Sequence, residues 1–377
     1  MKKAIAAIAT AVMLAGCSGS TQSDSHSESS HSSENVTQST TQNAASTSQT
    51  TSASTAPTSL TTSATTSAQQ TTAQEQKPAA DTRKPVILLG GGNIYHLLGK
   101  PFDPEQYLSY GDDTDRHPKL TFTGKVDTNH AGSYPIKAAI TDASGNVLEK
   151  DMTVRVVSSI PKGTQSAQQN TAFAEFANKY KGSAHSYGID VSQWQGNIDF
   201  NAVKAAGCSF VFIRVGTYYS SGTPDTHFAQ NLKKALAAGL DVGAYVYCTV
   251  TDKAQAVKCA QWVNAQLENA PLKLPVAFDW EEVKGFQNYG ASTGDVCDAY
   301  LAFKSEIEKS GRSTIVYSNR ELAAKLWNEQ CVSSGYWLAD YTERADNAGC
   351  PFRQVGVGRI NGINAPVDIN VRFKAQA

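Results

Sequence analysis

The sequence has no surplus of positive charge. Its 33 lysine and arginine residues are offset by 34 aspartate and glutamate residues, and the formal net charge is −1 at pH 7. Proteins that bind nucleic acid gather basic side chains on one face to neutralise phosphates. This balance provides no such excess, so the chain is not expected to bind nucleic acid.

Motifs for the common metal sites are also missing. No two cysteines are separated by two residues, and there is no His-Glu-x-x-His pattern, although thiolates and imidazoles at such spacings are the usual zinc ligands. Asp112, Asp113 and Asp115 offer oxygen ligands of the kind that calcium prefers. An acidic surface turn is nevertheless the favoured interpretation, and we predict no metal site.

A membrane-spanning apolar run is not present. The run at residues 4–13 is too short, because a transmembrane helix needs about 20 residues. Residues 1–16 instead follow the order of an export signal, in which basic residues precede an apolar segment and small residues. The tetrapeptide Leu-Ala-Gly-Cys at 14–17 resembles a bacterial lipobox, which implies cleavage before Cys17 and lipidation of its thiol. We expect an anchor on the outer face of the bacterial cell membrane; a plain secretory signal is the alternative.

Aromatic residues are missing from residues 17–82, which consist mainly of Ser, Thr, Gln and Ala. Such a segment cannot bury enough apolar surface to offset the entropy lost on ordering. We predict a disordered, Ser/Thr-rich tether between the anchor and the folded part of the protein.

Six cysteines remain when Cys17 is set aside, and an even number in an exported protein permits disulfides. The sequence does not select among the many possible pairings. The six are Cys208, Cys248, Cys259, Cys297, Cys331 and Cys350.

Residues 84–158 consist of short runs of alternating apolar and polar residues separated by Gly and Asn turns, as at 134–140. This period of two predicts a small antiparallel β-sandwich. The stretch 102–157 resembles the immunoglobulin-like modules of bacterial surface proteins, which implies a spacer or adhesive role. Residues 159–186 are predicted to be a polar linker with a short helix.

Strand-like apolar runs alternate with helical patterns throughout residues 187–377. About eight such runs predict an α/β fold, a compact TIM-like (β/α) barrel of parallel strands. The segment is shorter than the roughly 250 residues typical of this barrel, so some late helices are expected to be missing. Helices are predicted at 200–206, 226–238, 253–267, 293–310 and 320–327.

Acidic residues recur where the predicted strands end, at the rim where such barrels carry their functional residues. An unpaired charge in a buried strand costs several kcal/mol, so a repeated occurrence favours a function over chance. The acids are Asp190, Asp279, Glu281, Asp340 and Asp368. Ion pairing is the structural alternative, of Asp340 with Arg344 or of Asp368 with Arg214 or Arg372.

Asp279 and Glu281 are two residues apart, so on a strand their side chains share one face, about 6.5 Å apart along the chain. Two ionised carboxylates at that distance repel, and one therefore keeps its proton toward neutral pH. Hydrolysis of a glycosidic bond needs a proton donor beside an anion. We predict that Glu281 is the general acid and that Asp279 polarises or orients the substrate.

Aromatic residues also occur at or near the predicted strand ends, and sugar rings stack their apolar C–H faces on flat side chains. Half of these aromatics are expected in the core. Tyr247, Tyr317 and Trp337 are predicted to line sugar subsites. The further predicted substrate-binding residues are Trp194, Asp340 and Arg214.

The motifs that carry these residues resemble glycoside hydrolase family 25, the Chalaropsis-type lysozymes. The resemblance begins with Gly-Ile-Asp-Val-Ser-Gln-Trp-Gln-Gly at 188–196 and covers 187–373 in the family's order. It continues through Phe-Ile-Arg at 212–214, Pro-Val-Ala-Phe-Asp-Trp-Glu at 275–281, Trp-Leu-Ala-Asp-Tyr at 337–341 and Val-Asp-Ile-Asn at 367–370.

This resemblance implies an irregular, flattened barrel that needs no cofactor and cleaves the β-1,4 bond between N-acetylmuramic acid and N-acetylglucosamine in peptidoglycan. Carried over by position, Glu281 is the acid/base, Asp279 is its partner, and Asp190 and Asp368 are active-site carboxylates. Inversion and assistance by the substrate's acetamido group both remain open as mechanisms. The expected partners are peptidoglycan strands and the membrane, and the protein is expected to be a monomer.

A protein of another class shares many of these features, namely a wall-binding or adhesive lipoprotein that uses the barrel only to hold sugar. The adjacent acids favour the enzyme, because a binding module has no use for a proton donor beside another carboxylate. A serine hydrolase is disfavoured, although residues 290–294 fit Gly-x-Ser-x-Gly, because no histidine follows His227 and that motif requires one downstream.

Overall fold

The computed structural model describes residues 81–161, 171–182, 184–329, 331–333, 335–342 and 350–373, and all of them belong to one compact unit. The predicted export signal, the lipidation site Cys17 and the predicted tether lie outside the described residues. Within the described ranges, no helix combines the length and apolar character that crossing a membrane requires.

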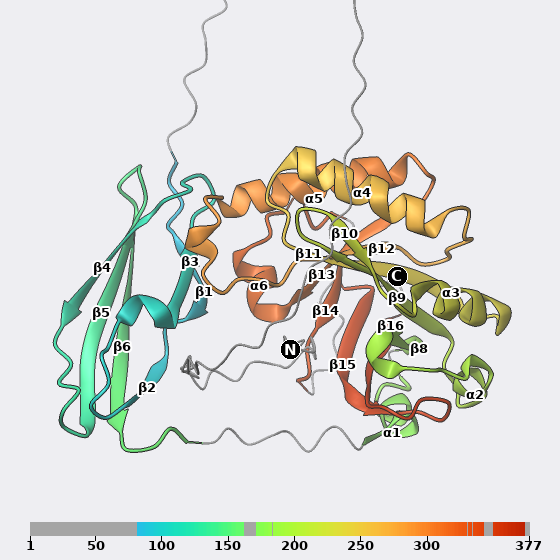
Figure 1. Ribbon diagram of the computed structural model, residues 1–377, viewed down its shortest axis with the longest axis horizontal. Coiled ribbons are helices and arrows are strands. Elements are labelled where there is room, and N and C mark those ends of the chain that lie inside the picture. The colour runs from blue at the N-terminus through green and yellow to red at the C-terminus, as the bar shows by residue number, and fades with distance from the viewer. Residues whose placement is uncertain are drawn as a thin grey trace, which may run out of the picture. The chain divides into compact units, whose positions relative to one another are not determined.

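The strand-rich part contains two small sheets (Figure 1). One pairs β1 (Val86–Gly90) with β3 (Leu108–Gly111), and the other has the order β2-β6-β5-β4. The strands of the second sheet are β2 (Asn93–Leu97), β4 (Lys119–Gly124), β5 (Gly132–Thr141) and β6 (Val147–Val157), and a short 3₁₀ helix, η1, covers Pro104–Tyr107.

Period-two burial in β5 explains why this part folds as a sandwich. Ile136, Ala138 and Ile140 are buried, while the residues between them are more exposed. The buried set packs with Ile94 and Val154 in a separate core. The prediction of a β-sandwich is therefore confirmed, except that β2 and β6 are parallel rather than antiparallel.

A short strand and helix follow. Strand β7 (Thr171–Ala172) pairs with the edge of β15, and α1 (Phe173–Lys179) buries Phe173 and Phe176. The helix predicted in the linker is thus present and packs on the barrel.

Eight strands close the barrel, since β8 pairs with both β9 and β16. Neighbours from β8 round to β15 are parallel, whereas β16 is antiparallel to β15 and to β8. The strands are β8 (Ala184–Val191), β9 (Phe210–Tyr218), β11 (Asp241–Cys248), β12 (Val276–Asp279), β13 (Thr314–Asn319), β14 (Tyr336–Ala339), β15 (Phe352–Arg359) and β16 (Val367–Phe373).

The reversed direction of β16 corrects the expectation of parallel strands throughout. Only residues 360–366 join β15 to β16. A short loop can connect antiparallel strands, but a parallel pair needs a crossover of a dozen or more residues, usually a helix. Another antiparallel strand, β10 (Gly222–Pro224), folds back on β9.

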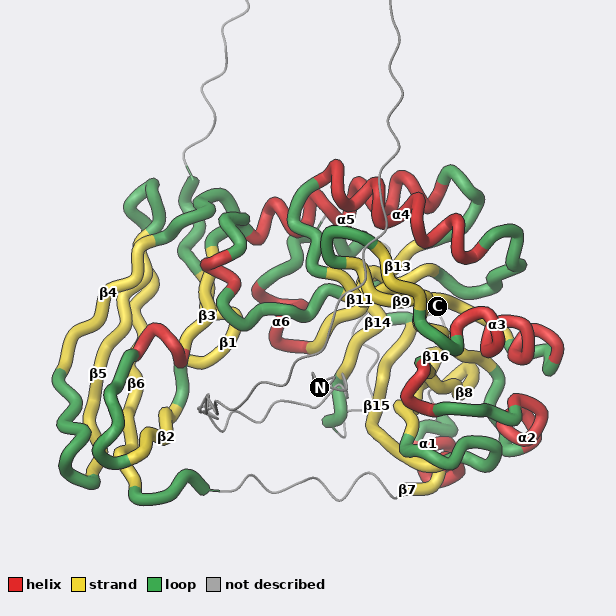
Figure 2. Tube along the Cα trace, viewed as in Figure 1, coloured by secondary structure: helices red, strands yellow, loops and turns green. Residues whose placement is uncertain are grey.

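Helices surround the strands, and Figure 1 shows the two longest, α4 and α5, side by side. Side chains of Asp199, Asp252 and Ser292 cap the first turns of α2, α4 and α5, as N-cap residues commonly do. No α-helix follows α6 within the described ranges, as expected (Figure 2). The five helices predicted for this part are α2 (Phe200–Ala205), α3 (Phe228–Ala237), α4 (Lys253–Leu267), α5 (Thr293–Glu308) and α6 (Arg320–Lys325), with 3₁₀ turns η3 (Gln193–Gln195) and η4 (Phe286–Asn288).

Two apolar cores lie on either side of the barrel wall. In β12, Val276 and Phe278 pack in the outer core beneath the helices, whereas Ala277 belongs to an inner core of aromatic residues. Phe212 and Trp337 stack inside the barrel with ring centroids 4.3 Å apart. Because successive side chains on a strand alternate in direction, Asp279 points to the same side as Ala277.

Strand β3 of the sandwich contacts the segment that follows β12 in the sequence. The Ser109 hydroxyl oxygen accepts the backbone N–H of Gly285 at 2.8 Å, and the Asp112 carbonyl oxygen accepts that of Thr293 at 2.8 Å. The sandwich is therefore joined to the barrel by hydrogen bonds that backbone N–H groups of the barrel part donate.

Apolar packing and an ion pair strengthen this junction. Leu88 of β1 is part of the outer core of the barrel. Gly111 lies against the buried ring of Phe286, where a Cβ atom would come within 2.6 Å of the ring. The guanidinium of Arg116 binds both carboxylate oxygens of Asp295, at 2.8 and 2.9 Å.

Candidate active site

Four acids gather at one end of the barrel. Asp279 ends β12, Glu281 follows it, and Asp190 lies near the end of β8. Asp368 lies at the start of β16, but this strand runs in the opposite direction, so its start is at the same rim. Asp190 and Asp368 are direct neighbours across the β8–β16 pairing.

Asp190 is held by two amides. One of its oxygens accepts hydrogen bonds from Asn370 Nδ2 at 2.7 Å and from Gln354 Nε2 at 3.0 Å. The residue is only 7% exposed. Burial raises the pKa of Asp190 to about 6, even though the two amide hydrogen bonds favour the charged form.

Asp279 and Glu281 are in direct contact through their carboxyl groups. Burial raises the pKa of Glu281 to about 7, with Asp190 and Glu282 adding to the rise and the hydrogen bond with Asp279 opposing it. Burial, and then the charge of Glu281, raises the pKa of Asp279 well above its ordinary value. The pair therefore retains a proton near neutral pH, as expected for neighbouring acids.

One oxygen of this pair has no partner. Asp279 is 5% exposed, and its Oδ1 is buried without a hydrogen bond. Glu281, in contrast, is partly exposed. Glu281 is thus the more exposed residue of the pair.

Asp368 completes the group. Burial raises its pKa well above the ordinary value, and the charge of Asp190 adds to this, while the hydroxyl of Tyr341, 3.5 Å from Asp368 Oδ1, partly opposes it. This hydroxyl also donates to Gln354 Oε1 at 2.8 Å.

Gln354 links the acids to the aromatic residues. Its Oε1 accepts hydrogen bonds from the hydroxyls of Tyr317, at 3.0 Å, and Tyr341. That arrangement leaves its amide nitrogen to donate to Asp190. Gln354 and Asn370 were not among the site residues predicted from the sequence. Asn370 was detectable, because it is two residues from Asp368 on one strand and so shares its face.

Exposed aromatic rings lie at or just after the ends of barrel strands. Tyr247, opposite Asp279 in the sheet register, is partly exposed, and its hydroxyl donates to Glu282 at 3.4 Å. Tyr219 is 53% exposed and lies edge-on to Tyr247, with centroids 6.5 Å apart. Trp194 is 39% exposed. Tyr219 and Glu282 were not among the predicted residues.

Two predicted subsite residues lie in the inner core instead. Trp337 is 1% exposed and donates its indole N–H to Asn370, and Tyr317 is 4% exposed. Neither ring can stack on a sugar in this structure, which corrects the prediction. The period of two on β13 and β14 turns both rings into the barrel.

Arg214 and Asp340 are engaged in ion pairs. Arg214 binds Asp225 through two nitrogens, each 2.8 Å from Oδ2, and both residues are buried. It does not pair with Asp368, as had been considered. Asp340 pairs with Arg320; burial raises its pKa, but the hydrogen bonds from Arg320 and Thr342 and the charge of Arg320 together lower it. Neither prediction of direct substrate binding is retained, and Arg344 lies outside the described residues.

All six cysteines of the described part are buried, free thiols. The disulfides that the sequence permits are therefore not present among the described residues. Two pairs of thiols are in contact, Cys248 with Cys259 and Cys297 with Cys331.

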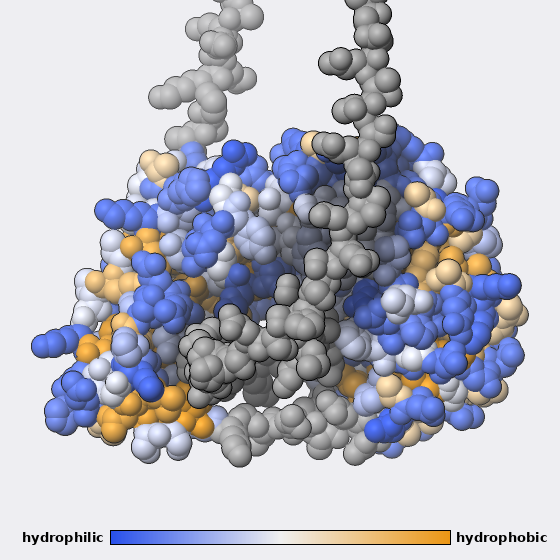
Figure 3. Space-filling model, viewed as in Figure 1, coloured by the Kyte–Doolittle hydropathy of each residue, from blue (hydrophilic) through white to orange (hydrophobic). Residues whose placement is uncertain are grey.

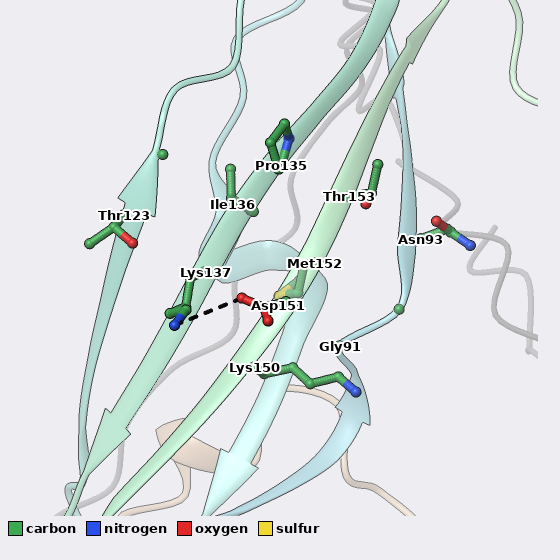
Figure 4. A pocket seen from close by; sticks show the side chains of 12 residues that line it. Gly91, Asn93, Thr123, Pro135, Ile136, Lys137, Lys150, Asp151, Met152 and Thr153 are labelled. Carbon is green, nitrogen blue, oxygen red and sulfur yellow. Dashed lines mark ion pairs between the residues drawn. The ribbon is translucent and has the colours of Figure 1, made fainter.

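A cavity of about 550 Å³ lies on the sandwich, far from these acids in the sequence, and Figure 4 shows its lining. Lys137 faces Asp151 there, with the nearest nitrogen and oxygen 4.0 Å apart. None of the lining residues is aromatic, so the cavity offers no flat surface for a sugar ring.

Most of the visible surface is hydrophilic (Figure 3).

Comparison with known families matches two parts of the chain. Residues 189–353 match the model of "Glycosyl hydrolases family 25", and residues 87–156 match "Bacterial surface protein, Ig-like domain".

Similar proteins include Lysozyme M1 of Streptomyces globisporus, which is 27% identical over 208 residues, covering 50% of this chain and 68% of the relative. The uncharacterized protein YegX of Escherichia coli (strain K12) is 30% identical over 210 residues, covering 52% and 72%. A solved structure, the bacterial lysozyme from Streptomyces coelicolor, is 27% identical and covers 51% of this chain and 93% of that one, with a TM-score of 0.43.

Proposed function

The chain belongs to glycosyl hydrolases family 25, and from this membership we propose that its barrel is a muramidase that cleaves the β-1,4 bond between N-acetylmuramic acid and N-acetylglucosamine. The observation that carries the proposal is the contact between Asp279 and Glu281, which keeps a proton near neutral pH beside two further acids. A purely sugar-binding module gains nothing from such a proton, so the adhesive alternative is not favoured.

Glu281 is proposed to protonate the leaving glycosidic oxygen. It is the more exposed residue of the pair, and its pKa of about 7 allows it to be protonated at neutral pH. Asp190 and Asp368 lie opposite each other on β8 and β16 at the same rim, where negative charge stabilises the oxocarbenium-like transition state. Asn370 and Gln354 act as positioning residues for Asp190.

Asp279 is proposed to orient the substrate's acetamido group. Its buried Oδ1 lacks a hydrogen-bond donor, and an acetamide N–H supplies one. Carboxyls of inverting enzymes are about 6.5–9.5 Å apart to hold a water between them. The hydrogen bond between Asp279 and Glu281 indicates that these two carboxyls lie closer together than this. We therefore favour assistance by the substrate, with the acetamido oxygen attacking the anomeric carbon.

The stereochemistry of the product tests this mechanism. Assistance by the acetamido group retains the β-configuration at the new reducing end, whereas direct attack by water inverts it. Proton NMR during the first minutes of hydrolysis, before the sugar mutarotates, distinguishes the two. An initial α-anomer would contradict the role given to Asp279.

Sugar rings are proposed to stack on the exposed aromatics Tyr219, Tyr247 and Trp194. Tyr247 also orients Glu282 through its hydroxyl.

Substitution of Glu281 by Gln tests the assignment of the acid. The change keeps the volume of the side chain but removes the titrating proton, so turnover on purified cell wall should fall by about 10²-fold or more. Circular dichroism and the melting temperature should remain those of the folded protein. A matched control is Glu321→Gln, on α6, which should have parental activity. A Glu281→Gln variant as active as the parent would refute the assignment.

A location at the cell surface is proposed from the lipobox-like residues at 14–17 and from the immunoglobulin-like module. Labelling of cells with an alkyne-bearing fatty acid should mark the parent chain but not a Cys17→Ala variant, which should move to the culture medium. Equal retention of both proteins on the cells would count against the anchor.

A further inference from the structure

Three carboxylates converge beside strand β3, outside the active site. One oxygen from each of Asp81, Asp112 and Asp113 lies within 4.8 Å of the other two. Calcium binds oxygen ligands at about 2.3–2.6 Å, so ligands on opposite sides of one ion are about 5 Å apart at most. The spacing of the three oxygens fits within a single coordination shell.

Two of these residues carry buried oxygens without donors. Asp112 is fully buried; its Oδ1 accepts the N–H groups of Thr114 and Asp115, but its Oδ2 has no partner. Oδ1 of Asp113 is also buried without a partner. A buried carboxylate oxygen needs a hydrogen-bond donor or a positive charge beside it, and both Asp112 and Asp113 have one oxygen without either. The spacing of the three carboxylates and these unpartnered oxygens therefore both favour a bound cation.

The surrounding positive charges do not balance the negative charge of the three carboxylates. Arg83 contacts the other oxygen of Asp113 at 3.3 Å, but its side chain is 68% exposed. The Thr114 hydroxyl donates to Asp81 Oδ2 at 2.9 Å and carries no charge. One guanidinium faces three carboxyl groups. Burial, then Asp112 and Asp81, raises the pKa of Asp113, as expected when like charges are crowded together.

The next charged residues along the chain, Asp115 and Arg116, have other partners. Asp115 accepts the N–H groups of His117 and Ala143, so it stabilises the turn, as the sequence suggested. Arg116 binds Asp295. The cation to be supplied is therefore an external one.

We propose that Asp81, Asp112 and Asp113 bind one calcium ion. Carboxylate oxygens without any histidine or cysteine select a hard cation. Calcium suits three ligands from an irregular stretch of chain better than magnesium, which requires near-ideal octahedral geometry. A cavity of about 370 Å³, lined in part by Arg83, Asp113 and Thr293, adjoins the cluster and gives room for water ligands.

The ion would join parts of the chain that are distant in sequence. Asp81 begins the described residues, just after the predicted tether. The carbonyl oxygen of Asp112 binds the N–H of Thr293 at the start of α5. Calcium at this point is therefore expected to stabilise the start of the sandwich and its junction with the barrel, without contributing to the chemistry of Glu281.

Calcium binding is tested on the full chain after removal of divalent ions with a chelator. Titration with calcium chloride alone should give saturable binding of one ion by isothermal calorimetry and a rise in melting temperature, and magnesium should be weaker. In Asp113→Asn, calcium affinity should fall by about tenfold or more, because ligand charge sets the affinity of such sites. The matched control, Asp151→Asn, alters a carboxylate on β6 whose side chain is 87% exposed and should bind like the parent.

Two results would overturn the proposal. One is the absence of saturable calcium binding by the parent, and the other is an equal loss of calcium affinity in Asp113→Asn and Asp151→Asn. If Asp113→Asn does not fold, Asp81→Asn replaces it, since Asp81 is partly exposed and its substitution leaves no buried group behind. Parental affinity in that variant would likewise count against the site. Muramidase activity does not enter the comparison, so a failed function leaves the result intact.

Discussion

At the scale of single residues, the environment of a carboxyl group matters more than its presence. Asp190, Asp279, Glu281 and Asp340 all lie at or just after the ends of strands, but among them only Asp340 has a cation that binds it directly and lowers its pKa. Burial raises the pKa of the other three. A sequence shows that acids recur at strand ends, but not which of them has an arginine as neighbour.

The pH dependence of activity should reflect Glu281. Its pKa is about 7, so the protonated form that donates to the leaving group disappears as the pH rises through that value, and kcat/KM on cell-wall fragments should fall along with it. Glu282 contributes to the raised pKa. The Glu282→Gln variant should therefore lose activity at a lower pH than the parent. An unchanged or higher midpoint in that variant would argue against this electrostatic coupling.

Asp190 should make stability depend on pH in the opposite sense to most carboxylates. Burial raises its pKa from 3.8 to about 6, so the folded state binds the proton more tightly than the unfolded state. The resulting stabilisation is complete below pH 3.8 and is lost as the pH rises through about 6.

Substitution of Asp190 by Asn removes this dependence. At pH 7.5 the free energy of unfolding of the variant should exceed that of the parent by about 1–3 kcal/mol, and the difference should shrink toward pH 4. Urea denaturation at the two pH values measures it. A variant that is less stable than the parent at pH 7.5 would show that the hydrogen bonds from Asn370 and Gln354 need the charge.

At the scale of secondary structure, the sequence predicted where the strands and helices lie better than it predicted the direction of each strand. The alternation in β12 correctly separates Ala277 from Val276 and Phe278, because period two follows from strand geometry alone. The same rule applied to Tyr317 and Trp337 shows which rings share a face, but not that this face is the closed interior. That distinction depends on where the barrel becomes too narrow for solvent, a property of all eight strands together.

Packing between neighbouring strands predicts a sensitive position at Gly188. A Cβ atom here would lie 2.4 Å from the ring of Phe210 on the adjacent strand. Gly188→Ala should lower the free energy of unfolding by about 1–3 kcal/mol through overpacking. Adding Phe210→Leu should recover part of the loss relative to Phe210→Leu alone. Fully additive effects in this double-mutant cycle would mean that the two side chains do not clash.

At the scale of the whole molecule, the sandwich and the barrel share more than a linker. Leu88 lies in the outer core of the barrel, and Ser109 of β3 and the adjacent Asp112 accept hydrogen bonds from the segment after β12. The sequence predicted each fold from its own pattern, but no pattern indicates that two segments about 180 positions apart meet. Contacts of this kind arise from surface complementarity, which is not periodic.

A shared boundary predicts that the two parts unfold together. Calorimetry of the full chain should show one transition, since the sandwich cannot leave without exposing Leu88 and Phe286. In Gly111→Ala, the new methyl group meets the Phe286 ring at 2.6 Å, and the transition should broaden or split. Arg116→Ala is the control; it loses only an ion pair with a 61% exposed arginine, which is worth at most about 1 kcal/mol. Two transitions in the parent would contradict the coupling.

The reversed strand β16 has a consequence for when the enzyme first becomes able to cut. It closes the ring between β15 and β8, and it carries both Asp368 and the amide that holds Asp190. Every other strand of the ring precedes it in the order of synthesis. A partly synthesised chain therefore has an open barrel and an incomplete set of acids, so it cannot be active until this strand has been made.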